Sequence, residues 1–273
     1  MKKLVFLAFF TLFSFADTNL ELVKGQALFL EFEKANLKEL KIKDQNLPYF
    51  THPKDNGKVL AIFSLPYKNP AKNTQIEAFY KDKKKEIFHI IMLEGHYTSE
   101  KIIVQTQKVF PPQKVQKRIQ NELKEANAIY AKFTPEALFD GAFIKPLDSF
   151  ITSDFGRARI FNEQVASYHS GTDFRAAIGT KIKATNSGIV RLAKDRYYAG
   201  LSVIIDHGYG IYSQYYHLSK LSVKVGEKVK KGQIIGLSGA SGRVSGPHLH
   251  FGIFAGGKQI DPLNFMQKFN ALF

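Results

Sequence analysis

Hydrophobic and polar positions alternate in short runs over the first third of the chain, which is the pattern of half-buried β-strands. Runs rich in β-branched and aromatic residues occupy positions 27–32, 59–63, 76–80 and 86–93. Turn signals such as Asp55-Asn56-Gly57 separate these runs. Residues 17–111 are therefore predicted to form a small antiparallel β-sandwich. His52, His89 and His96 are scattered through it, and we expect them to be structural or surface residues.

The period of the pattern changes after Pro111-Pro112. The apolar positions that follow lie three or four residues apart and form one stripe on an otherwise charged segment, namely Val115, Ile119, Leu123, Ala126 and Tyr130. This spacing predicts an amphipathic helix. Thr134 followed by Pro135 has the form of an N-cap and first residue of a second, short helix. Residues 112–140 are thus predicted to be a helical linker.

Strand-like runs return between residue 141 and residue 273, with glycines marking tight turns. They cover positions 182–184, 188–192, 202–206 and 213–216, and a sharp loop at 225–233 leads into another. The fold class predicted for the whole chain is mainly β with a helical linker. It comprises an N-terminal antiparallel β domain and a C-terminal antiparallel β domain.

Residues 1–16 have the composition of a secretory signal peptide. Lys2 and Lys3 precede the apolar run 4–13, and Ser14-Phe15-Ala16 offers small residues at a cleavage position. The run is too short to span a bilayer as a helix. We therefore expect an exported, periplasmic protein without stable membrane insertion. The chain has no cysteine, so its exported form would depend on its cores and on metal rather than on disulfides.

The chain of 273 residues carries 39 basic and 24 acidic residues, a formal charge of +15. The basic residues are spread along the sequence without interleaved aromatic residues or a DNA-binding motif, so nucleic acid is not the predicted partner. Outside the cytoplasm the available polyanion is the cell wall, whose peptides carry carboxylates. A generally cationic, solvated surface is the alternative interpretation.

The strongest chemical signal is the pair His248-Leu249-His250, downstream of His169-Ser170-Gly171-Thr172-Asp173. Alternate residues of a strand point to one face, so His248 and His250 can look into one cavity. The Ser-Gly-Thr link can turn back and bring His169 and Asp173 together. Two imidazoles and one carboxylate make a zinc site with an open fourth position. Two histidines, His217 and His248, are then available for proton transfer.

Other hydrolytic arrangements do not fit the sequence. The run Gly236-Leu237-Ser238-Gly239-Ala240 lacks the last glycine of a nucleophile elbow, and no cysteine is present for thiol chemistry. A helical His-Glu-x-x-His motif is absent. We interpret the glycine-rich segment 236–246 as a cleft wall close to an extended substrate. His207 lies between glycine-rich turn residues and is interpreted as a turn residue rather than a ligand.

Residues 150–265 resemble the LytM/lysostaphin family of zinc metalloendopeptidases, which cut the peptides of peptidoglycan. The matching motifs occur in family order, and they include Ser153-Asp154-Phe155-Gly156-Arg157, His169-Ser170-Gly171-Thr172-Asp173, Tyr216-His217-Leu218, Gly239-Ala240-Ser241-Gly242 and Gly246-Pro247-His248-Leu249-His250-Phe251. The chain departs from the family's Phe-Gly-x-Arg element, with arginines at 157 and 159.

The resemblance implies one zinc ion held by His169, Asp173 and His250, with His217 and His248 as catalytic residues. It also implies an antiparallel β domain of LytM type with an open groove, at residues 141–273. The implied substrate is peptidoglycan, cut at D-Ala–diaminopimelate bonds in cross-links or stem peptides, and some bacterial members shape cells.

Two alternatives accompany this interpretation. Some family relatives have lost ligands and act as activators of wall amidases or as wall-binding modules, whereas this chain retains every His and Asp position. In the second alternative, the N-terminal β domain covers the groove and holds the enzyme latent, with the amphipathic helix docking it on the catalytic face.

Overall fold

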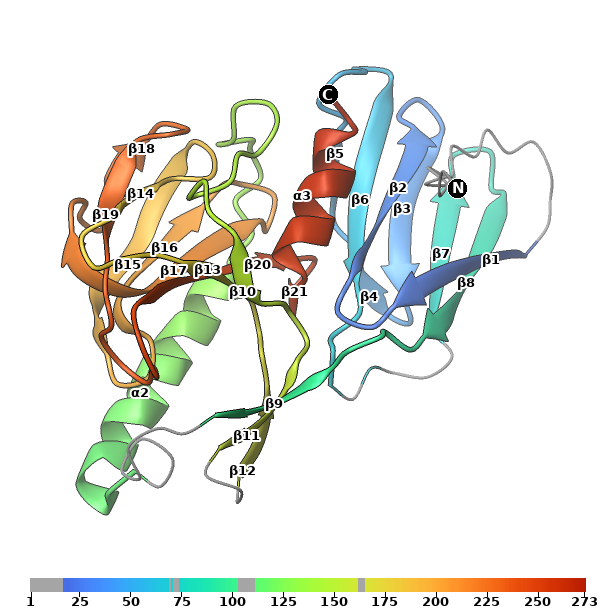
Figure 1. Cartoon of the computed structure of the whole chain (residues 1–273). Coiled ribbons are helices and arrows are strands. Elements are labelled where there is room, and N and C mark those ends of the chain that lie inside the picture. Colours follow the sequence, from blue (N-terminus) through green and yellow to red (C-terminus); the bar gives the residue numbers. More distant parts are fainter. Residues whose placement is uncertain (1–16, 69, 71–73, 103–110, 162–164) are drawn as a thin grey trace, which may run out of the picture.

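The computed structural model describes residues 17–68, 70, 74–102, 111–161 and 165–273. The predicted signal peptide, residues 1–16, lies outside the described residues. Strands dominate the two parts of the molecule, which lie side by side with helix α3 (Pro262–Asn270) between them (Figure 1). The predicted mainly β fold class is therefore confirmed. No helix in the described ranges combines the length and the hydropathy needed to cross a bilayer.

The N-terminal part consists of two facing sheets. A five-stranded sheet has the order β1-β8-β7-β3-β4, and a three-stranded sheet has the order β2-β6-β5. Neighbours are antiparallel except β1 and β8, which run parallel. The strands are β1 (Thr18–Val23), β2 (Ala27–Glu33), β3 (Leu37–Ile42), β4 (Gln45–Asn46), β5 (Tyr49–Thr51), β6 (Lys58–Ser64), β7 (Thr74–Tyr80) and β8 (Lys85–Leu93).

Alternation decides which side of each N-terminal strand is buried. On β7, Thr74, Ile76 and Ala78 are buried while Gln75 is exposed, as expected for side chains that point to opposite faces. Strand β6 is buried along both faces because it lies in the inner sheet: Leu60 and Ile62 face the C-terminal part, and Val59 and Ala61 join the core of the sandwich.

The C-terminal part is built on a ten-stranded sheet. Its main path is β10-β13-β20-β17-β16-β15-β18, with β14 on β19, β19 also on β17, and β21 on β20, and all of these pairs are antiparallel. The strands are β10 (Ile151–Ser153), β13 (Thr172–Arg175), β14 (Lys181–Lys183), β15 (Gly188–Arg196), β16 (Gly200–Asp206), β17 (Tyr212–Leu221), β18 (Lys228–Val229), β19 (Ile234–Ser238), β20 (His248–Ala255) and β21 (Lys258–Ile260).

Two elements connect the parts. Strand β9 (Ser99–Ile102) leaves the N-terminal sandwich and pairs in parallel with β11 (Ala158–Phe161), whose antiparallel partner is β12 (Val165–Tyr168). Helix α2 (Gln113–Tyr130) then lies along the C-terminal part (Figure 1). Its predicted apolar stripe ends in Tyr130, which stacks on Phe254 at 4.3 Å between ring centroids. The stripe therefore packs against strand β20 at its C-terminal end.

The second predicted helix, at Thr134, is wrong: residues 131–140 contain no helix. The backbone of this segment instead forms hydrogen bonds with the turn that follows β16. Tyr209 donates its N–H to the carbonyl of Thr134, and Leu138 donates to the carbonyl of His207. Thr134 Oγ1 lies 2.7 Å from Asp206 Oδ2 and so does not cap a helix. These long-range partners replace the local bonds that a helix would make.

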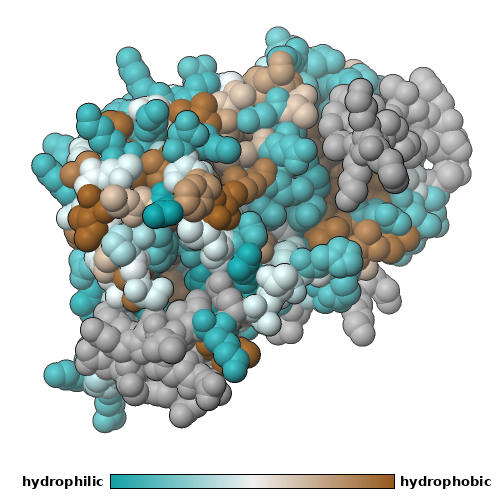
Figure 2. All heavy atoms as spheres, viewed as in Figure 1, coloured by the Kyte–Doolittle hydropathy of each residue, from teal (hydrophilic) through white to brown (hydrophobic). Residues whose placement is uncertain are grey.

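Helix α3 was not predicted, although Asp261-Pro262 is a helix start: Asp261 accepts from the N–H groups of Leu263 and Asn264. Its buried face carries Phe265 and Phe269, whose rings lie 5.8 and 6.1 Å from the ring of Phe29 on β2. Residues of both parts consequently share one hydrophobic core. Figure 2 shows hydrophilic residues spread over both parts of the visible face, with hydrophobic ones in smaller groups between them.

Candidate metal centre

The register between β13 and β20 fixes the first two members of the candidate centre. Asp173 stands directly opposite His250, and Arg175 stands opposite His248. Directly opposed residues of an antiparallel pair have their side chains on the same face at short range. His169 lies four residues before Asp173, at the start of the short connection that leads into β13. Sequence-distant groups thus meet because two strands pair.

The link between His169 and β13 passes very close to β20. A Cβ atom on Gly171 would lie 2.4 Å from the carbonyl oxygen of Phe251 and 2.7 Å from Nε2 of His250. Both contacts are shorter than van der Waals packing allows, so only glycine fits here. The glycine of the predicted Ser-Gly-Thr link therefore permits the close approach that brings His169 to the centre.

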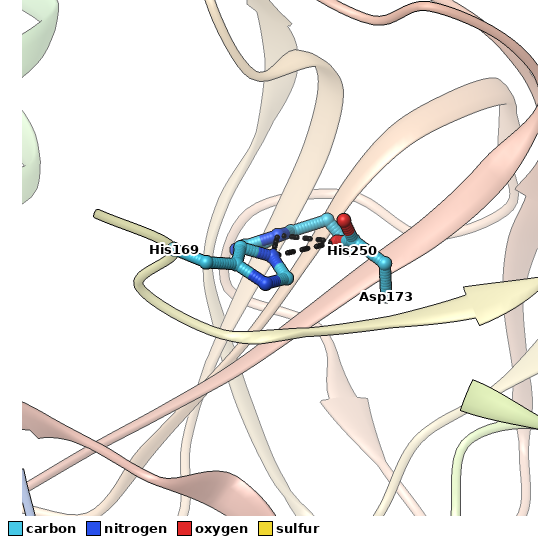
Figure 3. A group of neighbouring side chains, drawn as sticks. All are labelled: His169, Asp173 and His250. Atoms are coloured by element: carbon cyan, nitrogen blue, oxygen red, sulfur yellow. Dashed lines mark hydrogen bonds and ion pairs between the residues drawn. The ribbon is translucent and has the colours of Figure 1, made fainter. Parts of the chain in front are cut away.

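Three donor atoms converge at the centre (Figure 3). His169 Nε2 lies 2.8 Å from Asp173 Oδ1 and 2.9 Å from His250 Nδ1, and the latter two atoms are 2.9 Å apart. All three residues are buried. Two nitrogen lone pairs and a carboxylate oxygen crowded in this way repel one another unless a proton or a cation lies among them, and these residues could hold a metal ion.

Groups around the centre fix the orientation of His169 and Asp173. His169 Nδ1 lies 2.8 Å from the carbonyl oxygen of Asp154 and 3.1 Å from Ser153 Oγ. A proton on Nδ1, donated to that carbonyl, leaves the lone pair on Nε2 facing the centre. Arg159 donates to the other carboxylate oxygen of Asp173, Oδ2, at 2.7 Å. Each of these contacts turns a donor atom toward the shared point.

The protonation states favour cation binding. Burial by itself would raise the pKa of Asp173, but its contacts with His169 and His250 outweigh that effect and hold the pKa well below the usual range. Burial lowers the pKa of His250 to about 4, against the opposing effect of Asp173. At neutral pH the carboxylate is therefore ionised and the imidazole of His250 is neutral, which are the forms that bind metals.

The two remaining predicted histidines lie beside the centre. His248 Nε2 is 3.7 Å from Asp173 Oδ1, and the rings of His217 and His248 are 4.9 Å apart. His217 Nδ1 lies 2.8 Å from the carbonyl oxygen of Ser241, and His248 Nδ1 lies 2.9 Å from that of Gly246. With Nδ1 donating in each ring, Nε2 is left as the proton acceptor.

Strand β17 extends beyond the predicted run 213–216, because it continues through His217 to Leu221. A β-bulge interrupts the pairing with β16 between Tyr215 and Leu218. His217 has φ +64°, in the left-handed region that non-glycine residues rarely adopt. The bulge re-aims the imidazole toward the cavity. Burial, followed by the charges of His248 and His250, lowers the pKa of His217 well below its ordinary value.

A cavity of about 440 Å³ opens over the centre. It contains Asp173, His217, His248 and His250, while α2 forms one wall with residues that include Leu123. The predicted cleft-wall segment contributes residues 243–245. His207 lies away from this cavity: it is fully buried, with Nδ1 2.7 Å from the carbonyl oxygen of Ser187.

Several polar residues of the cavity were not assigned roles from the sequence, among them Arg159, Tyr216 and Arg243. Arg159 was noted only as a departure from a motif, and Tyr216 only as part of one. The Tyr216 ring stacks on that of His250 at 5.1 Å and 16°. Arg243 lines the cavity from the segment before His248. No local pattern distinguishes these residues, because their contacts join segments far apart in the sequence.

Comparisons with known proteins were consistent with this geometry. Residues 167–262 match the family model described as Peptidase family M23. Peptidoglycan DD-endopeptidase ShyA of Vibrio cholerae is 43% identical over 122 residues, which is 43% of this chain and 28% of ShyA. Lysostaphin of Staphylococcus simulans is 43% identical over 106 residues, which is 37% of this chain and 22% of lysostaphin. The matched part is thus less than a third of each relative's length.

One solved structure is similar over nearly the whole chain. It is a crystal structure of a Pseudomonas aeruginosa protein named for peptidase M23, with 27% identity and a TM-score of 0.70. The match covers 90% of this chain and 96% of that chain. The arrangement of the N-terminal sandwich with the C-terminal sheet is therefore shared by the two proteins.

Proposed function

We propose that this chain, whose residues 167–262 form a domain of peptidase family M23, is an exported zinc endopeptidase that cleaves peptide cross-links of peptidoglycan. The observation that carries the proposal is the convergence of His169, Asp173 and His250 on one point, beside a cavity lined by Asp173, His217, His248 and His250. The proposed bond is D-Ala–diaminopimelate, in keeping with relatives named DD-endopeptidases.

The donor set suits zinc. Two neutral imidazoles and one carboxylate are a common protein ligand set for a catalytic zinc ion, which leaves a further coordination position open. His169 Nε2, Asp173 Oδ1 and His250 Nδ1 would hold the ion. When bound, zinc polarises a carbonyl group and lowers the pKa of water to about 7.

The two other histidines are assigned the proton transfers. A water molecule that attacks an amide must lose a proton, the developing oxyanion needs a hydrogen-bond donor, and the leaving nitrogen must gain a proton. His217 Nε2 and His248 Nε2 are positioned for these tasks, because each ring is fixed through Nδ1 by a backbone carbonyl. One ring would accept the proton while the other stabilises the oxyanion.

The experiment measures zinc and product on the same samples. We expect the full chain to contain one zinc ion by elemental analysis, and to release muropeptides from purified sacculi that mass spectrometry identifies as products of cross-link cleavage. His169→Ala and Asp173→Ala should each lose both zinc and product. His96→Ala, an exposed histidine outside the cavity, is the matched control and should retain both.

Two results would contradict the proposal. Product from His169→Ala at the wild-type rate would remove this residue from the centre. Stoichiometric zinc without any product from sacculi would instead favour the alternative of a catalytically silent activator of wall amidases or a wall-binding module. Release of products cut at another bond would correct the proposed specificity.

A further inference from the structure

Positive charge dominates the cavity that holds the candidate centre. The cavity-lining residues in the described part of the chain include three arginines, Arg159, Arg196 and Arg243, and two acidic residues. One acidic residue is Asp173 itself. The other, Glu122 on α2, lies within 2.6 Å of Arg118 Nε and 2.8 Å of the Tyr197 N–H. The cavity is therefore suited to an anionic group of a ligand.

Arg243 is held in a defined place relative to the catalytic histidines. Its segment joins β19 to β20, and the carbonyl groups of Ser241 and Gly246 in that segment orient His217 and His248. Arg243 lies between these two positions. The backbone N–H of Arg243 donates to the carbonyl of Tyr198 at 2.9 Å. The Arg243 guanidinium lies over the Tyr198 ring, 4.4 Å from its centroid.

The backbone beside Arg243 is tightly fitted as well. Gly242 has φ +80°, and a Cβ atom there would lie 2.4 Å from both the nitrogen of Gly200 and the carbonyl oxygen of Tyr198. The segment is therefore pressed against the start of β16 and has little freedom to shift. A guanidinium stacked on an aromatic ring and attached to such a backbone is pre-organised for binding.

Arg159 contributes charge from another part of the cleft. It lies on β11, far from Arg243 in sequence, and both residues line the same cavity. Burial lowers the pKa of Arg243, and the positive charge of Arg159 acts in the same direction while Tyr198 opposes it. Both guanidinium groups line the cavity, so a substrate carboxylate bound there would lie in the field of both positive charges.

We propose that Arg243, assisted by Arg159, binds a free carboxylate of the substrate on the leaving-group side of the scissile amide. We infer the leaving-group side from the proposed proton transfers: the leaving nitrogen would take its proton from His217 or His248, and the segment that orients both rings also carries Arg243. The preferred substrate is a cross-link whose amine-donating carbon also bears an ionised carboxylate, and its carboxamide counterpart is disfavoured. This inference rests on the proposed endopeptidase function.

The experiment uses the full, zinc-loaded chain and two synthetic cross-linked peptides. The peptides differ only at the carbon that bears the leaving nitrogen, which carries a carboxylate in one and a carboxamide in the other. A charge-assisted hydrogen bond accounts for roughly a 10- to 100-fold difference in kcat/KM. We expect the wild-type chain to prefer the carboxylate peptide by a ratio of that order.

Arg243→Gln should abolish the preference by slowing cleavage of the carboxylate peptide alone. Arg243→Lys keeps the positive charge but lacks the planar set of guanidinium N–H donors, and it should retain part of the preference. Lys228→Gln is the matched control, because it removes a positive charge from an exposed position on β18, outside the cavity. It should leave the preference unchanged. Zinc content and the midpoint of thermal unfolding are measured for every variant.

The outcomes separate this inference from the proposed function. Equal wild-type rates on the two peptides would overturn the carboxylate site. An equal loss of activity on both peptides in Arg243→Gln would also overturn it, and would instead assign Arg243 a role in holding the segment between β19 and β20. If the zinc-loaded wild-type chain cleaves neither peptide nor sacculi, the endopeptidase function fails and the inference fails with it.

Discussion

Arg159 and Asp173 are joined on the outer side of the candidate centre: the guanidinium donates to Oδ2 at 2.7 Å, while Oδ1 faces His169 and His250. This contact fixes the rotation of the carboxylate. We expect Arg159→Gln to weaken zinc affinity about 10- to 100-fold, which is the effect of losing such an outer partner. Competition with a zinc chelator measures the affinity directly.

Lys228→Gln is the control for that measurement, because Lys228 is exposed on β18 and does not line the cavity. Its zinc affinity should remain that of the wild-type chain. Tighter zinc binding by Arg159→Gln would mean that charge repulsion between the arginine and the cation exceeds the benefit of orienting Asp173.

His217→Asn separates proton transfer from metal binding. Asparagine tolerates the left-handed backbone that His217 adopts, so the β-bulge should persist while the imidazole is lost. We expect unchanged zinc content and a fall in kcat of about 10²- to 10⁴-fold. Elemental analysis and initial rates on muropeptides provide the two readouts, and a variant that retains the wild-type kcat would exclude His217 from the chemistry.

Leu123 tests whether α2 serves as a wall of the substrate cleft. This side chain is 60% exposed and lines the cavity, so Leu123→Ala should leave thermal stability unchanged. We expect KM to rise about 2- to 10-fold with kcat unaltered, because a contact equal in ground and transition states is lost. Lys124→Ala, the adjacent exposed position outside the cavity, is the control. A rise in kcat would instead support a latent enzyme that the helix restrains.

A truncated chain that begins at Gly141 would lose part of the hydrophobic core that the two parts share. Phe29 packs on Phe265 and Phe269, and Ala27, Phe50, Leu60 and Ile62 belong to the same core as the C-terminal sheet. Removing the N-terminal part uncovers this apolar surface. We expect a lower unfolding midpoint and self-association by light scattering. A monomeric truncated chain with the wild-type midpoint would contradict the shared core.

His207 should make stability depend on pH independently of the candidate centre. Burial lowers its pKa from 6.5 to about 4, so the unfolded chain binds the proton more readily than the folded one. Its contribution is therefore complete above pH 6.5 and is lost as the pH falls toward 4, by about 3 kcal/mol in total.

Denaturant unfolding at pH 7 and pH 4.5 measures this loss. His207→Gln, which cannot titrate, should lose about 2–3 kcal/mol less than the wild-type chain between these two values. The comparison uses the difference between pH values, since the substitution also removes the ring contact with Phe143. Parallel pH profiles for the two chains would show that His207 is not the titrating group.

Strand-length runs and the amphipathic stripe after Pro112 predicted the long strands and helix α2, because their periods reflect which face of each element is buried. Strands β1 and β3 and most of the short strands were not predicted. The helix expected at Thr134 failed because its backbone is bonded to the turn after β16, which no local pattern reveals. Helix α3 has an N-cap and first-residue pattern in Asp261-Pro262, from which it could have been predicted.

The sequence by itself determined the chemistry available to this protein: the residue types at 169, 173, 217, 248 and 250, and the spacing that puts His248 and His250 on one face of a strand. Tertiary structure decided which of those groups meet. The pairing of β13 with β20 sets Asp173 against His250, the bulge in β17 turns His217 inward, and separate segments bring Arg159 and Arg243 into one cavity. These relationships depend on register and packing between distant segments, whereas a one-dimensional pattern records only neighbours along the chain.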